Sequence, residues 1–113
     1  MTRNGMLILV GFGLPILLGI LALPLRLGKV RPNLYYGFRT PKTMSSPEIW
    51  YEANRFAGQW LLAASALTIL INFSLWYTRP DWPPEILTVA MACVGAFFTL
   101  LASIRSVFYL RKF

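Results

Sequence analysis

The chain has 113 residues, of which 57% are hydrophobic and only 13% are charged. An ordinary soluble domain carries about 25% charged residues, and a chain this short cannot surround several wholly apolar helices with a polar shell. The composition therefore excludes a soluble globular protein and predicts an integral membrane protein. The net charge of +7 does not predict a nucleic-acid partner, because Lys and Arg in a membrane protein first report its orientation.

The numbers of cysteine and histidine residues limit which metal sites and catalytic nucleophiles the chain could form. The sequence contains one cysteine, Cys93, and no histidine. A His/Cys zinc site, a Ser-His-Asp triad and haem ligation by histidine all need residues that this chain lacks. We therefore expect no metal and no cofactor. Cys93 falls in an apolar stretch, where a small packing residue is the simplest interpretation.

Three uncharged stretches, residues 4–25, 56–78 and 86–104, dominate the sequence. A hydrocarbon core of about 30 Å needs about 20 apolar residues per helix. We therefore predict an all-α membrane protein with one domain, 1–113, and transmembrane helices at about 5–25, 56–78 and 86–105. The first stretch is too long for the apolar part of a signal peptide and lacks a small-residue cleavage site, so we interpret it as an uncleaved span.

Small residues in two spans predict close helix packing. Gly11, Pro15 and Gly19 are spaced at i, i+4 and i+8 in the first span, and Ala92 and Ala96 are four apart in the third. Such spacing lets another helix approach closely. Pro15 also removes a backbone hydrogen bond, so we expect a kink there.

The segment between the first two spans, residues 26–55, mixes Gly, Pro and Asn with basic and aromatic residues. This punctuation predicts a loop of defined shape. Ser46, Pro47 and Glu48 then form a good helix start, since Ser caps, Pro suits the first helical position and Glu complements the helix dipole. We predict one helix from Pro47 to about residue 77, longer than the bilayer, with its first three turns projecting into the cytoplasm or lying along the interface. The alternative is a break near Gly58 that separates an interfacial helix from the span. The third helix is expected to begin between residues 81 and 85.

The basic residues predict the orientation. Three crossings place the 26–55 segment and the C-terminus on one side, which then holds nine of the eleven Lys and Arg residues. The positive-inside rule assigns this side to the cytoplasm and the N-terminus to the outside.

Charged residues on the cytoplasmic side are the candidates for chemistry. Glu48 and Glu52 lie four apart on one helix face, with Arg55 one turn further. A paired-carboxylate acid/base site is one interpretation, and acids held by neighbouring arginines are the favoured one. Arg105 is expected to fold back onto Glu52 or to reach the lipid headgroups. An enzyme that acts on lipids or peptides would have only these two acids, Arg39 and Arg105 to use. The sequence shows no recognised catalytic spacing, so we do not expect an enzyme.

One ordered set of residues resembles the SdpI family of membrane proteins. Its members in this sequence are Pro32, Asn33, Gly37, Phe38, Arg39, Thr40, Pro41, Thr43, Trp50, Asn54 and Gly58. The resemblance implies a three-span fold with a signature loop between the first two spans, and places Arg39, Thr40, Trp50 and Asn54 at characteristic positions. Trp50, Asn54 and Gly58 share one line of a helix. Gly58 is expected to let the loop or another helix approach closely, and Trp50 is expected to clamp it. Arg39 is expected to lie beneath that helix and to bond backbone carbonyls or the two glutamates.

The candidate binding and motif residues combine this loop with the charged cluster. They are Asn33, Gly37, Arg39, Thr40, Glu48, Trp50, Glu52, Asn54, Arg55, Gly58 and Arg105. The resemblance implies a bacterial plasma-membrane protein that acts in immunity against a toxin peptide or in membrane signalling. Its expected partners are membrane lipids and an antimicrobial peptide or cytoplasmic regulator. The alternative function is a transporter or channel subunit for small solutes, which would require a homo-oligomer because three spans enclose little volume.

Overall fold

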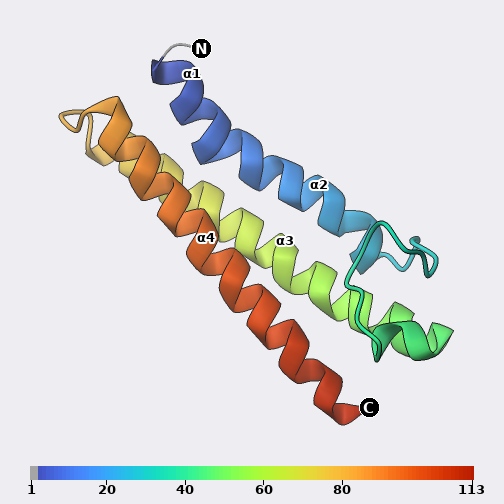
Figure 1. The fold of residues 1–113 in the computed structure, drawn as a ribbon. Coiled ribbons are helices and arrows are strands. Elements are labelled where there is room, and N and C mark those ends of the chain that lie inside the picture. The colour runs from blue at the N-terminus through green and yellow to red at the C-terminus, as the bar shows by residue number, and fades with distance from the viewer. Residues whose placement is uncertain (1–2) are drawn as a thin grey trace.

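The computed structural model describes residues 3–113 as an elongated helical bundle measuring 52 × 25 × 20 Å. The elements are α1 (Arg3–Ile8), η1 (Leu9–Gly13), α2 (Leu14–Arg26), η2 (Thr43–Ser45), α3 (Pro47–Thr78), α4 (Pro84–Tyr109) and η3 (Leu110–Lys112). Figure 1 shows α1 and α2 as one continuous rod, with the C-terminus at the same end as the loop that joins α2 to α3. The prediction of an all-α protein is confirmed, and three helical segments are long and apolar enough to cross a membrane: Asn4–Arg26, Pro47–Thr78 and Pro84–Lys112.

A π-helical turn, η1, interrupts the first rod where Pro15 removes a backbone donor. In a regular helix the amide of residue 15 would bond the Gly11 carbonyl, and proline has no amide hydrogen. The side chain of Asn72 on α3 replaces that donor, with its Nδ2 2.7 Å from the Gly11 oxygen. One turn later, the Ser65 hydroxyl donates to the Pro15 carbonyl at 2.5 Å. The predicted irregularity at Pro15 is therefore a π turn whose freed carbonyl bonds a neighbouring helix.

The small residues of the first rod lie against the other helices. Gly11 and Pro15 are buried, and a Cβ added to Gly19 would lie 3.0 Å from the Ser65 hydroxyl. The prediction of close packing along this line is confirmed. By contrast, Ala92 and Ala96 on α4, the other small residues for which close packing was predicted, are both exposed.

The central helix α3 packs against both α2 and α4. Ser46 caps it by accepting from the Ile49 amide at 3.2 Å, and Pro47 is its first residue, as predicted. The helix runs through Gly58 without interruption to Thr78, so the alternative with a break at Gly58 is wrong. Its 32 residues correspond to a length of about 48 Å, well beyond the hydrocarbon thickness of about 30 Å.

A short turn joins α3 to α4 at the end of the bundle that also holds α1, which we call the hairpin end. Helix α4 begins at Pro84, within the predicted range. Leu7, Leu87 and Met91 form a buried apolar cluster beneath this turn, and Trp82 packs on it. The opposite end carries the α2–α3 loop, residues 27–46, which we call the cap.

Candidate functional site

The cap begins with a sharp reversal of the chain after α2. Gly28 has φ +69°, and the amide of Lys29 returns to the Pro24 carbonyl at 3.0 Å. A glycine in this left-handed conformation is the usual way to end a helix. A Cβ at Gly28 would lie 2.8 Å from Nε of Arg55, so the arginine packs directly on the reversal. Arg55 therefore helps to position the start of the cap.

Asn33 shapes the tip of the cap. Its Oδ1 accepts hydrogen bonds from the amides of Tyr35 (2.9 Å) and Tyr36 (2.7 Å), and its Nδ2 donates to the Arg31 carbonyl at 2.7 Å. An asparagine that bonds the backbone two residues ahead mimics a turn. This local network explains the Pro-Asn pair in physical terms: the tip is held by its own side chain.

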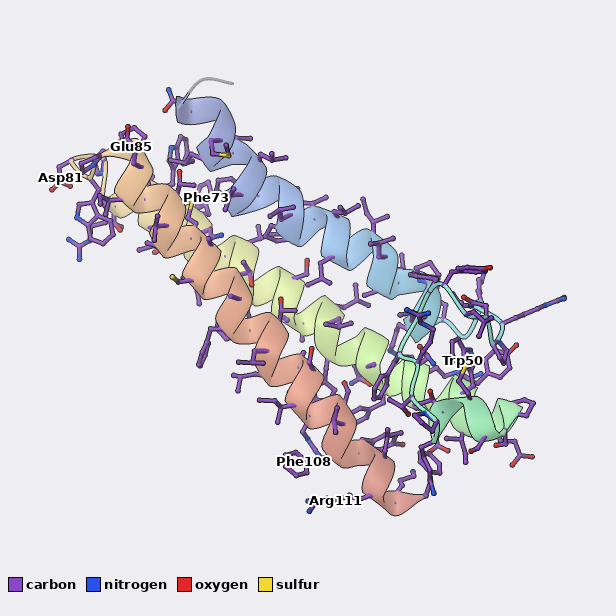
Figure 2. All side chains as sticks on the ribbon, in the orientation of Figure 1. Trp50, Phe73, Asp81, Glu85, Phe108 and Arg111 are labelled. Carbon is purple, nitrogen blue, oxygen red and sulfur yellow. The ribbon has the colours of Figure 1, made fainter. Side chains whose placement is uncertain are left out.

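Trp50 and Asn54 on α3 fasten the cap to the bundle. Trp50 is 0% exposed, and its indole Nε1 donates to the Val30 carbonyl at 2.9 Å. Asn54 bonds both backbone groups of Phe38, accepting from its amide at 2.7 Å and donating to its carbonyl at 3.3 Å. Figure 2 shows Trp50 beneath the loop. The predicted clamping role of Trp50 agrees with this geometry, and Trp50 has no surface left for a partner.

Gly37 leaves room for that clamp. Its φ is +117°, a conformation that side chains rarely adopt. A Cβ there would lie 2.9 Å from Oδ1 of Asn54 and 3.1 Å from the Trp50 ring. Any side chain at residue 37 would therefore push the loop off the helix.

Thr40 and Thr43 form a reciprocal pair that ends the cap. The amide of Thr40 donates to the Thr43 hydroxyl oxygen at 2.7 Å, and the amide of Thr43 donates to the Thr40 hydroxyl oxygen at 3.1 Å. Thr43 is 0% exposed. The pair starts the short helix η2, which leads directly to the Ser46 cap of α3. Thr43 was not among the predicted site residues, although the Thr-x-x-Thr spacing is a visible signal for such a pair.

Arg39 lies on the outside of the cap. Its side chain is exposed, and Nη1 donates to the Leu34 carbonyl within the same loop. The expected position beneath α3 is therefore wrong. Arg39 does bond a backbone carbonyl, as predicted, but the carbonyl belongs to its own loop, and Arg39 bonds that rather than either glutamate. The Tyr36 hydroxyl likewise donates to the Leu21 carbonyl on α2. Tyr36 was also missed as a cap residue.

Gly58 is the point of closest approach between α2 and α3. A Cβ at Gly58 would lie 2.6 Å from the Arg26 amide nitrogen and 2.9 Å from the Ala22 carbonyl oxygen. These are backbone atoms, so no side chain can move aside. The last turn of α2 can therefore rest on α3, directly beside the cap, only because residue 58 is glycine.

The glutamates face different surroundings. Glu52 accepts from Lys112 at 2.6 Å and from the Tyr109 hydroxyl at 2.9 Å, which ties the C-terminal turn to α3. Glu52 and Lys112 both lie outside the three uncharged stretches. Their hydrogen bonding lowers the pKa of the Glu52 carboxyl and raises the pKa of the Lys112 ammonium. Glu48 is exposed in the first turn of α3. Glu48 and Glu52 do not form a paired-carboxylate site, because Glu52 bonds Lys112 and Tyr109 in the C-terminal turn.

Arg105 does not fold onto Glu52, so the first of its two expected placements is wrong, and its contact with lipid headgroups stays a prediction. Its guanidinium carbon lies 5.4 Å from the Phe56 ring centroid and 5.8 Å from that of Trp60. Phe56 also stacks on Tyr109, with ring centroids 3.8 Å apart. The aromatic surface of α3 attracts Arg105 by cation–π contact, while Lys112 and Tyr109 occupy the carboxylate.

An apolar pocket of about 300 Å³ lies beneath the cap. The loop residues 36–38 cover it, and its walls include Leu18 and Leu21 of α2 and Val107 of α4. The hydroxyl of Ser106 in the wall donates to the carbonyl one turn back on its own helix, so the pocket presents mainly apolar atoms. Among residues 3–113, no three His, Cys, Asp or Glu side chains gather where they would hold a metal ion.

The predicted residues thus divide into two groups. Those that hold the cap together are Asn33, Gly37, Thr40, Trp50, Asn54, Arg55 and Gly58. The second group, Arg39, Glu48, Glu52 and Arg105, is exposed; Arg55 is exposed as well, and Arg39 bonds the cap through the Leu34 carbonyl. No curated protein and no solved structure matched the sequence. A model of the SdpI/YfhL protein family matches residues 29–103, which include most of the cap, all of α3 and most of α4. The chain therefore belongs to the SdpI/YfhL protein family.

Proposed function

We propose that this membrane protein of SdpI type is a binding protein that acts in toxin-peptide immunity or membrane signalling, through a cap on the cytoplasmic face of the bacterial plasma membrane. The family membership supports the class of function. The charge distribution supports the orientation, because nine of the eleven basic residues lie at the cap end. No enzymatic activity is part of the proposal.

The observation that carries the proposal is the exposed tip of a loop whose turn is defined by hydrogen bonds to Asn33. Leu34 is 70% exposed and Tyr35 is 89% exposed, although Asn33 fixes the turn that presents them. Loops positioned by a scaffold often carry function, and exposed apolar side chains on such a loop can mark an interaction surface. The buried clamp residues hold the loop, whereas Leu34 and Tyr35 contribute nothing to that clamp.

The charge around the tip indicates the kind of partner. Arg31 and Arg39 flank Leu34 and Tyr35, and both arginines are exposed. A partner that carries carboxylates or phosphates beside an apolar contact would complement this surface. An acidic cytoplasmic regulator fits that description, and so does the inner leaflet with anionic lipids. We favour the regulator, because a turn fixed by Asn33 presents a defined shape that a fluid lipid surface does not need.

The test separates the tip from the clamp. The family that the sequence resembles includes an immunity protein against a secreted cannibalism toxin, so a sensitive bacterial strain that expresses the chain is challenged with that toxin. We expect survival with the native chain and loss of protection in a Leu34→Ala/Tyr35→Ala double variant at equal membrane abundance. Leu70→Ala/Tyr77→Ala, which also removes two exposed side chains, is the matched control away from the cap.

Three outcomes would contradict this proposal. Absence of protection by the native chain would remove immunity to this toxin as its function. Full protection by the double variant would show that the tip is not the functional surface. Loss of protection in the control as well would assign the effect to general damage rather than to the tip.

A second candidate is an oligomeric transporter or channel subunit, and one observation favours it. Ala92 and Ala96 are exposed and line a groove of about 370 Å³ between α2 and α4, where a second copy would find small residues to approach. Ala96→Cys in a Cys93→Ser background should then form cross-linked dimers in lipid nanodiscs. A strictly monomeric protein would refute this candidate.

A further inference from the structure

An arginine without an acidic partner lies where α4 packs beside α3 at the cap end. Arg105 is exposed, and within residues 3–113 its guanidinium forms no ion pair. It crosses to the neighbouring helix, where its guanidinium carbon lies 5.4 Å from the ring centroid of Phe56 and 5.8 Å from that of Trp60. An arginine that only needed water could extend away from the bundle. The cation–π contacts therefore hold this charge at a defined place on α3.

The contact between Arg105 and the two rings lies at the headgroup level of the membrane. The uncharged stretch 86–104 is about 28 Å long as a helix, close to the hydrocarbon thickness of about 30 Å, and Arg105 follows it directly. Phe56 and Trp60 lie at the same level on α3, because both contact Arg105. Tryptophan favours this level of a bilayer, and Trp60 is 39% exposed. A ligand would therefore meet this surface among the lipid headgroups.

The same surface offers hydrogen-bond donors that the protein itself does not use. The indole N–H of Trp60 forms no hydrogen bond within residues 3–113, whereas the indole N–H of Trp50 donates to a carbonyl of the cap. The guanidinium of Arg105 forms no hydrogen bond to any of these residues either. Guanidinium N–H groups match two oxygens of a phosphate at once. Arg105 and Trp60 can therefore both donate to a phosphate ester.

The charges around Arg105 favour an anionic headgroup over a zwitterionic one. Glu52, one turn before Phe56 on α3, accepts from Lys112 at 2.6 Å. Arg105, Lys112 and Glu52 thus carry two positive charges and one negative charge. Glu48, the other acid of the cap end, lies one turn of helix further from the rings, about 6 Å along α3. The ammonium of phosphatidylethanolamine would meet this surplus of positive charge, whereas the net charge of phosphatidylglycerol would offset it.

We propose that Arg105, Phe56 and Trp60, which we call the Arg105 surface, bind the headgroup of an anionic phospholipid, with phosphatidylglycerol as the test case. The phosphate accepts from the Arg105 guanidinium, and the Trp60 indole donates to an oxygen of the same headgroup. The acyl chains extend into the membrane past Leu101, which lies one turn before Arg105 on α4 and is 47% exposed. The Arg105 surface is separate from the tip of the cap, so this lipid site does not depend on which partner the tip binds.

The first experiment measures lipid retention by native mass spectrometry of the full chain in mild detergent. Phosphatidylglycerol and phosphatidylethanolamine with identical chains are offered in equal amounts. Arg105→Gln should lower the ratio of bound phosphatidylglycerol to bound phosphatidylethanolamine about fivefold, which is equivalent to the contribution of about 1 kcal/mol from one arginine near an anionic headgroup. Arg105→Lys keeps the charge but not the planar guanidinium, so it should restore only part of the ratio.

Arg111→Gln is the matched control, because it removes another exposed cation from the same end of α4. The Arg111 guanidinium carbon lies 4.6 Å from the centroid of the Phe108 ring, and Figure 2 shows both side chains on the side of α4 turned away from α3. Removing Arg111 takes away the same formal charge without touching the Arg105 surface. The ratio of the two bound lipids should therefore change little in Arg111→Gln.

A second experiment identifies the neighbouring lipid in a bilayer and leaves the Arg105 surface intact. A photo-reactive benzoylphenylalanine is placed at position 101, in nanodiscs that hold phosphatidylglycerol as the minor lipid. The crosslinked lipids should be enriched in phosphatidylglycerol over the composition of the nanodisc, and Arg105→Gln should remove that enrichment. The same probe at position 70 is the control, because Leu70 is 66% exposed and lies about 15 Å along α3 from Trp60. It should report the composition of the nanodisc in both backgrounds.

Several results would overturn the proposal. An equal fall of the ratio in Arg105→Gln and Arg111→Gln would reduce the preference to general positive charge, as would full recovery in Arg105→Lys. Displacement of phosphatidylglycerol by inorganic phosphate would assign the surface to a free anion rather than to a lipid. Crosslinks at position 101 that match the nanodisc composition would place the lipid elsewhere. Loss of toxin protection in Arg105→Gln with unchanged lipid retention would assign Arg105 to a protein partner.

Discussion

Replacing Gly58 with alanine should separate α2 from α3 and destabilise the protein by about 2 kcal/mol. The new Cβ would lie 2.6 Å from the Arg26 amide nitrogen, about 0.8 Å short of an ordinary contact of 3.4 Å. Overpacking costs typically 1–3 kcal/mol, and the upper value of about 3 applies because the contact is with backbone. Alanine gains about 1 kcal/mol over glycine in helix propensity. The net loss is therefore about 2 kcal/mol.

Gly95→Ala on α4 is the matched control for this prediction. The nearest atom to a Cβ at Gly95 is Cγ2 of Thr68 at 3.5 Å, an ordinary contact. Only the propensity gain remains there, so Gly95→Ala should stabilise the protein by up to about 1 kcal/mol. Unfolding is followed by tryptophan fluorescence as detergent micelles are enriched in dodecyl sulfate. If both variants shift the midpoint in the same direction by similar amounts, the backbone contact at Gly58 does not limit helix packing.

Two further predictions concern the polar contacts of the bundle. Asn72→Leu should destabilise the protein by about 1–2 kcal/mol in the same unfolding assay, because it leaves the Gly11 carbonyl without its donor next to Pro15; an unchanged midpoint would show that another group satisfies that carbonyl. Glu52→Gln should lower the midpoint at pH 7 and lose that effect in acid. The pKa of Glu52 is lowered from its usual 4.5, so the contribution of the carboxylate is present above that value and disappears as pH falls through the lowered pKa; a difference from the native chain that persists in strong acid would contradict this.

The spans and the start of α3 were predictable because each depends on local properties. Hydrophobic length alone places three helices, and the Ser46–Pro47–Glu48 sequence provides the capping chemistry within three residues. The glycines predicted helix contacts for a similar local reason: a residue without a side chain lets another helix approach closely. Gly58 and Gly19 both lie where another helix approaches closely.

The partners of the charged side chains were not predictable in the same way. Glu52 pairs with Lys112, sixty positions along the chain, and Arg105 turns to the rings of Phe56 and Trp60 instead. Such choices depend on how α4 lies against α3, and long flexible side chains have several acceptable partners of similar energy. The Thr40–Thr43 pair was visible as a spacing, but its burial depends on the whole cap.

The geometry of the cap separates the residues that define the family resemblance from those available to a partner. Trp50 and Thr43 are fully buried, and Asn54 is 2% exposed, so each acts by holding the loop. A change at any of them alters the surface only by unfolding the cap. The exposed tip at Leu34 and Tyr35 depends on that framework and contributes little to it. The tip can therefore vary without loss of fold, and specificity for a toxin or a regulator is better sought there than in the buried motif.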